Sequence, residues 1–143
     1  MANYKKASVI VIAAATGTQT ITNNASAATL LFTETTDSAG AFDGETFTTP
    51  YTGFYQFNFS LSWGAGVVQT AGFVVIQKMN PFGTMAYLLN GAVGDGAIQN
   101  ASRVISLTKD DQIRFLCSQT TGADRTPYAS YTTLSIVRVA NAS

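Results

Sequence analysis

The sequence predicts an all-β fold, a sandwich of two antiparallel sheets, and three observations support that prediction. Short runs of β-branched and aromatic residues alternate with clusters of Gly, Asn, Asp, Ser and Thr roughly every 8 to 15 residues, as in sandwiches and barrels. Helical periodicity is absent. Residues 53–63 alternate strictly, which places five large apolar side chains on one face of a long strand: Tyr55, Phe57, Phe59, Leu61 and Trp63.

Eight strands are expected, which suggests a two-sheet jelly roll. Val and Ile favour a strand at 7–14, and Pro50 and Gly53 suit the entrance of a strand at 53–63. Ile113, Phe115 and Cys117 alternate in a strand at 112–118. The ranges are 7–14, 28–33, 53–63, 71–79, 84–90, 101–107, 112–118 and 129–139, with residues 20–23 as a candidate short extra strand.

An even number of passes places both termini at one end of the sandwich. The connections 64–70, 90–100 and 119–128 then gather at the other end. Two segments are apolar on both faces, which a sheet with one solvated side does not need: Phe73–Ile76, and Leu134 with Ile136, Val137 and Val139. The surplus face meets another subunit or, as an alternative for Phe73–Ile76, these residues form a central strand of the sandwich.

Length and charge limit the partners of the chain. Its 143 residues fit one domain, 1–143, that buries roughly 68–70% of the surface exposed by the unfolded chain. Eight basic and eight acidic residues give no field that attracts nucleic acid. No apolar stretch reaches the ~18 residues of a membrane span, so membrane insertion is not expected. A charged fraction of only 11% indicates an obligate oligomer or a protein docked on a larger assembly, because monomers depend on charge for solubility.

The N-terminus has two interpretations. Lys5 and Lys6 followed by the apolar run 7–15 resemble a short signal peptide. The Val and Ile content of the same run favours a strand preceded by a short basic arm, residues 1–6.

Few residues offer catalytic or metal-binding chemistry. With no His and one Cys, the chain lacks disulfides, thiolate or imidazole zinc sites and His-based triads. Cys117 is expected to be a small buried hydrophobe. We expect no enzymatic activity and no cofactor.

Two acidic pairs still require an explanation. Asp110 and Asp111 supply oxygen ligands of the kind that calcium takes, but Asp also favours ordinary tight turns. Asp43 and Glu45 have the residue types of a glycosidase pair, yet they lie in a connection where polar residues are expected. In both cases the turn or loop is the favoured interpretation.

Glycine-rich and basic segments also have ordinary explanations. Residues 90–96 hold three glycines but lack the lysine and helix of a phosphate loop. Lys78, Arg103, Arg114 and Arg138 are dispersed over separate strands, which argues against a single-stranded nucleic acid site.

Four blocks of the chain resemble the globular domain of complement component C1q. The main block, residues 42–57, carries a core signature of the form F-x-x-P-x-x-G-x-Y-x-F, formed by Phe47, Pro50, Gly53, Tyr55 and Phe57. The others are residues 28–32, 104–113 and 133–136, where Asp110 and Ile136 stand in place of the usual glycines. The resemblance implies a ten-stranded jelly roll shared with tumour necrosis factor, a homotrimer, termini at the base and variable loops at the apex.

We expect a structural or binding role. A stalkless trimer is similar to the small jelly-roll proteins on tailed-phage capsids, so we expect a decoration or cement protein on the virion surface, bound to the major capsid protein or another virion surface. The alternative is a lectin-like adhesion module, soluble, fibre-borne, secreted or on a cell surface, that binds a cell-surface glycan or protein. The candidate docking arm is Met1, Tyr4, Lys5 and Lys6, and the candidate apical contacts are Val67, Val68, Asn90, Asp95, Asp124 and Arg125.

Overall fold

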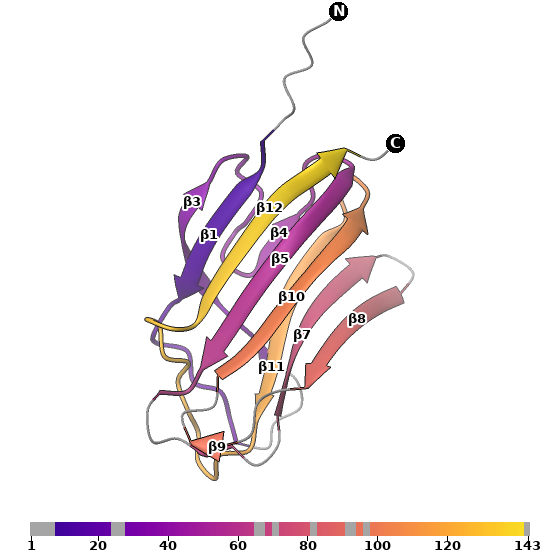
Figure 1. Ribbon diagram of the computed structural model, residues 1–143. Coiled ribbons are helices and arrows are strands. Elements are labelled where there is room, and N and C mark those ends of the chain that lie inside the picture. Colours follow the sequence, from indigo (N-terminus) through magenta and orange to yellow (C-terminus); the bar gives the residue numbers. More distant parts are fainter. Residues whose placement is uncertain are drawn as a thin grey trace, which may run out of the picture.

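The computed structural model shows a sandwich of two antiparallel sheets (Figure 1). The first sheet has the order β10-β5-β12-β1-β3. Its strands are β1 (Ile10–Ala15), β3 (Phe32–Asp37), β5 (Gly53–Ser62), β10 (Ile98–Leu107) and β12 (Thr133–Asn141). The structure describes residues 8–23, 28–64, 68–69, 72–80, 83–90, 94–95 and 98–141.

The second sheet has the order β2-β11-β7-β8, and β4 pairs with β11 as well. Its strands are β2 (Ala28–Thr29), β4 (Thr46–Thr48), β7 (Gly72–Asn80), β8 (Gly83–Asn90) and β11 (Gln112–Gln119). A separate pair is formed by β6 (Val68–Gln69) and β9 (Gly94–Asp95). Each main sheet holds five strands within the described residues, which confirms the predicted all-β jelly roll of about ten strands. No helix in the described part of the chain has the length and hydropathy of a membrane span.

The strand predictions fail where strands are short or polar. The predicted strand 28–33 is two strands, because the chain leaves the second sheet after Thr29 and enters the first at Phe32. That entering strand continues through exposed polar residues to Asp37, where no hydrophobic alternation marks it. Residues 20–23 form only an isolated bridge from Ile21 to Arg125. The short strands β4, β6 and β9 were not predicted.

Aromatic rings dominate the core between the two main sheets. Phe47, Tyr55 and Phe57 are fully buried, and the Phe47 ring centroid lies 5.6 Å from that of Tyr55 and 5.9 Å from that of Phe57, both edge to face. Such pairs contribute about 0.5–1.5 kcal/mol beyond burial of their area. The Tyr55 hydroxyl donates a hydrogen bond of 2.6 Å to the Tyr51 carbonyl oxygen, which satisfies its polar atom.

The two-sided apolar segments differ in the structure. Val74, Val75 and Ile76 are all buried within one chain, so the described side chains of the segment Phe73–Ile76 support the central-strand interpretation, while the side chain of Phe73 lies outside the described part of the structure. In β12, Leu134 and Ile136 are buried while Val139 is 38% exposed. Among the described side chains of the two segments, Val139 on β12 therefore leaves apolar surface exposed.

Both described ends of the chain lie at one end of the sandwich, which we call the base (Figure 1). Gly53 begins β5 there, and a Cβ atom at this position would lie 2.5 Å from the Ala140 carbonyl oxygen, so the close approach of β12 requires glycine. The opposite end, the apex, carries the β6–β9 pair and the connection from β11 to β12.

Candidate interaction surface

The two acidic pairs, Asp43 with Glu45 and Asp110 with Asp111, take part in turns and do not form a catalytic or metal site. The Asp43 carboxylate accepts hydrogen bonds from the backbone N–H groups of Thr46 and Glu45, at 2.7 and 2.9 Å. These two bonds lower the pKa of Asp43, which is the opposite of what a general acid needs. A Glu45 carboxylate oxygen lies 3.8 Å from Arg114 Nε. The pair therefore shapes the turn into β4.

Asp111 is similarly engaged at the base. Its carboxylate accepts a bond from the Thr108 backbone N–H at 2.9 Å and lies 3.2 Å from Lys78 Nζ. Asp110 adopts a φ of 75°, the conformation for which the C1q-like pattern uses glycine. Within the described residues no group of three or more Cys, His, Asp or Glu side chains could hold a metal ion. Here too the turn interpretation explains the residues.

The sole cysteine is inert by position. Cys117 is fully buried on β11, and desolvation raises the pKa of its thiol to about 12. A thiol that stays protonated at neutral pH is neither a nucleophile nor a metal ligand.

On four of the five strands of the first sheet, β10, β5, β12 and β1, the outward side has no charged side chain. Strand alternation assigns its members, since residues of the opposite alternation, such as Val11, Phe57, Ile105 and Leu134, are buried in the core. We call this set the neutral face: Ile10, Ile12, Ala14, Phe54, Gln56, Asn58, Ser60, Asn100, Ser102, Val104, Ser106, Thr133, Ser135 and Val137. The two charged residues on these strands, Arg103 and Arg138, are opposite the buried Phe57 and Tyr55 and so belong to the other side of the sheet.

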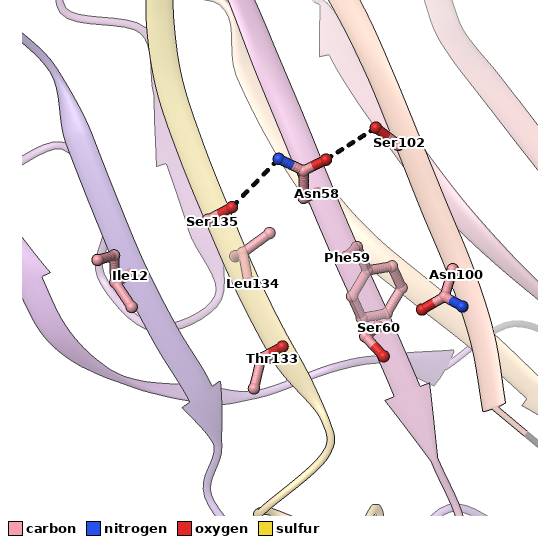
Figure 2. A pocket seen from close by; sticks show the side chains of 9 residues that line it. All are labelled: Ile12, Asn58, Phe59, Ser60, Asn100, Ser102, Thr133, Leu134 and Ser135. Atoms are coloured by element: carbon pink, nitrogen blue, oxygen red, sulfur yellow. Dashed lines mark hydrogen bonds between the residues drawn. The ribbon is translucent and has the colours of Figure 1, made fainter.

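Strand register gathers the polar part of the neutral face into a row. Ile12 is opposite Ser135, Ser135 is opposite Asn58, and Asn58 is opposite Ser102. Asn58 Nδ2 donates to Ser135 Oγ at 3.4 Å, and Ser102 Oγ donates to Asn58 Oδ1 at 2.7 Å (Figure 2). The amide thus finds partners within the chain on both sides.

A hollow surrounds this row. Its volume is about 310 Å³, and its walls come from β1, β12, β5 and β10, with Ile12 at one side and Asn100 at the other (Figure 2). Ile12 is 46% exposed, Val104 53% and Phe54 38%, so apolar groups lie around the polar row. The surface is therefore concave, uncharged and partly apolar.

The predicted apical contacts come together only in part. Strands β6 and β9 bring the loops of Val68 and Asp95 into one pair. Asp124 Oδ1 accepts the Asn23 backbone N–H at 3.0 Å, which joins two segments of the chain, and Arg125 Nε donates to Thr121 Oγ1 at 3.1 Å within its own loop. For Asn90 only the backbone is described, and Val67 lies outside the described residues.

A buried amide holds that apical loop in place. Gln119 is fully buried, and its Nε2 donates to the carbonyl oxygens of Ile21 and Ala123 at 3.0 and 2.8 Å. Its Oε1 accepts the backbone N–H and the hydroxyl of Thr121. The polar group is fully used, so the 119–125 loop has a defined conformation.

Two exposed tyrosines at the apex were missed by sequence reasoning. Tyr128 is 47% exposed and Tyr131 60%, and their ring centroids lie 5.5 Å apart with the planes tilted by 37°. The available signal was two tyrosines within the segment 126–132, of which Tyr128 falls in the predicted connection 119–128 and Tyr131 in the predicted strand 129–139. That segment is a turn that precedes β12.

The candidate docking arm, Met1, Tyr4, Lys5 and Lys6, lies outside the described residues. At the base, Tyr51 is 44% exposed, and the Arg138 guanidinium lies 5.4 Å from its ring centroid. The base therefore also presents an accessible aromatic ring.

Solved structures share this fold at low sequence identity. The crystal structure of murine APRIL at pH 8.5 has a TM-score of 0.69 and 10% identity, with 93% of this chain and 100% of that chain covered. Eiger TNF from S. frugiperda has a TM-score of 0.69 and 12% identity, with 95% of each chain covered. No protein-family model and no curated protein sequence matches the chain. The chain therefore has the tumour necrosis factor-like jelly-roll fold, as the C1q resemblance implied.

Proposed function

We propose that this protein is a non-enzymatic structural module that forms a homotrimer through the neutral face and decorates the capsid of a tailed phage. The neutral face is the observation that carries the homotrimer, whereas the capsid role rests on the similarity to small jelly-roll proteins of tailed-phage capsids. Cores of protein interfaces are depleted in charged residues, because each buried ion costs several kcal/mol of desolvation unless it is well paired. An uncharged outward face across four strands avoids that cost.

Internal hydrogen bonds lower the cost further. Asn58 already bonds Ser135 and Ser102 within the chain, so covering this row leaves fewer polar atoms without partners. The hollow offers room for side chains from a neighbouring copy, and exposed Ile12 and Val104 supply apolar area. Threefold symmetry is what the C1q and tumour necrosis factor resemblance implies for such a jelly roll.

Sedimentation equilibrium of the full chain and of two matched variants tests the assembly. We expect wild type at three times the 15.1 kDa chain mass. Asn58→Lys introduces a positive charge into the neutral face. This variant should be monomeric, with an unchanged β-sheet circular dichroism spectrum. Gln112→Lys makes a similar change at an exposed position of the opposite sheet and should remain trimeric. A wild-type monomer at micromolar concentration, or a trimeric Asn58→Lys, contradicts the assembly.

Attachment to the capsid is proposed at the base. Both described chain ends lie there, and Tyr51 offers an exposed ring beside them. Three copies of one weak contact add through high effective concentration, so each need not be strong. Deletion of residues 1–6, or Tyr51→Ala, should lower the occupancy of isolated capsids, whereas replacement of residues 90–100 should not. The opposite pattern would place docking at the apex.

The second candidate is a recognition module for a cell-surface ligand. The observation that favours it is the exposed Tyr128–Tyr131 pair at the apex, the end opposite the proposed docking base. The two roles are compatible, because they use different ends of the molecule.

A further inference from the structure

The Tyr128–Tyr131 pair lies on a turn that hydrogen bonds fix to the end of β5. The Tyr128 N–H donates to the Ser62 carbonyl oxygen at 2.8 Å, and the Tyr128 carbonyl accepts the N–H groups of Tyr131 and Thr132 at 3.1 and 2.9 Å. The Thr132 hydroxyl is buried and bonds the backbone of Ser62 in both directions. The backbone of the turn is thus fixed to the end of β5, and the two rings that it carries contact each other.

The chemistry around the rings is neutral and rich in hydroxyl groups. Residues 126–133 contain no charged side chain, and Thr126 and Ser130 are exposed. The loop 16–20 lies against the turn, since a Cβ at Gly17 would lie 3.5 Å from Ala129 Cβ, and this loop also carries exposed threonines and no charge. A strongly ionic ligand would find no counter-charge in these two segments.

The accessible aromatic area suits a small ligand better than a protein. A tyrosine buries about 150–250 Å² when fully covered, so two rings that are about half exposed offer roughly 200 Å². A stable protein interface needs roughly 800 Å² from each partner. One or two sugar rings match the smaller area, because their C–H faces stack on aromatic rings and their hydroxyls bond neutral polar groups at the rim.

We infer that the apical Tyr128–Tyr131 pair, with its rim of threonine and serine hydroxyls, binds a neutral glycan. Each chain carries both tyrosines of the pair, and three copies would raise the avidity of a weak single site. This inference deepens the recognition role named above and does not depend on capsid docking.

The experiment measures binding of the full chain to immobilised neutral gluco-, galacto- and manno-oligosaccharides and to sialylated counterparts. We expect at least one neutral glycan to bind, with affinity about tenfold weaker in Tyr128→Ala or Tyr131→Ala, since aromatic anchors dominate small contact sites. Tyr131→Phe should retain most of the binding, because the ring remains. Tyr51→Ala is the matched control, since Tyr51 is 44% exposed, close to the 47% of Tyr128, but lies at the base.

Each other outcome overturns the inference. No binding to any neutral glycan at millimolar concentration, preference for the sialylated set alone, or unchanged binding by both apical alanine variants would each exclude the proposed site. Tyrosine-dependent binding to periodate-oxidised cell envelopes, whose sugar diols are destroyed, would indicate a protein partner instead. Sedimentation of the same variants separates this result from the assembly: if Tyr131→Ala is monomeric, the ring belongs to a subunit contact and the glycan site is wrong.

Discussion

Replacing Asp110 with glycine should raise the free energy of unfolding. Asp110 is the only non-glycine residue with positive φ among the described residues, at 75°, in the turn between β10 and β11. The left-handed region costs an L-residue roughly 1–2 kcal/mol, less for Asp, whose side chain can bond locally. Glycine adopts this conformation without that cost.

The net gain is small and can be worked out from the turn. Asp110 donates its N–H to the Thr49 carbonyl at 2.8 Å, and Asp111 donates to the Thr108 carbonyl at 3.0 Å, so glycine keeps both backbone bonds. Glycine also adds freedom to the unfolded chain, which costs about 0.4–1 kcal/mol. We expect a net gain of about 0.5 kcal/mol and a melting temperature about 1–2 °C higher.

Urea unfolding of three proteins measures the effect: wild type, Asp110→Gly and Asp110→Ala. Alanine has the Cβ atom but no local acceptor, so Asp110→Ala should be about 1 kcal/mol less stable than Asp110→Gly. Equal stability of the two variants would show that this backbone conformation is not strained. A destabilised Asp110→Gly would show that the carboxylate makes a contribution larger than the strain.

Three further results are expected. Tyr55→Ala should lose about 3–5 kcal/mol of a total of roughly 5–15, because it removes a fully buried ring, and an unchanged melting curve would contradict the core assignment. Cys117 should resist iodoacetamide in the folded protein, where its pKa is about 12, and react after denaturation; rapid labelling of the native chain would show that β11 opens. Stability should fall as the pH drops below about 4, the pKa of Asp in the unfolded chain. The reason is that folding lowers the pKa of Asp37 and of Asp43. Their contribution to stability is therefore complete above the unfolded pKa and is lost as the pH falls through the folded pKa. For Asp37, partial burial works against ionisation, and backbone bonds from Phe42 and Ala41 outweigh it; Asp37→Asn should therefore flatten the acid limb of a pH-dependent urea titration.

Candidate sites were predicted from sequence with mixed success, for identifiable reasons. The turn interpretation of Asp43 and Asp111 follows from residue type alone, because Asp bonds nearby backbone N–H groups whatever the rest of the fold does. The candidate contacts Asp124 and Arg125 were chosen for loop position, yet their side chains bond within the apex. Tyr131 was placed in a strand because turn and strand share the same polar and aromatic residue types in this segment.

The sequence by itself determined the long strands and the core. Alternation in 53–63 needs no partner strand to be recognised, since burial of one face is encoded residue by residue, and Phe57 is accordingly buried. Two-residue strands such as β6 and β9 carry no such pattern, because their existence depends on the partner that supplies hydrogen bonds. The neutral face likewise required tertiary structure: Ile12, Ser135, Asn58 and Ser102 lie on four strands far apart in the chain, and only register aligns them into one row. Local periodicity fixes which side of a strand is buried, whereas the pairing of distant strands decides which exposed residues become neighbours.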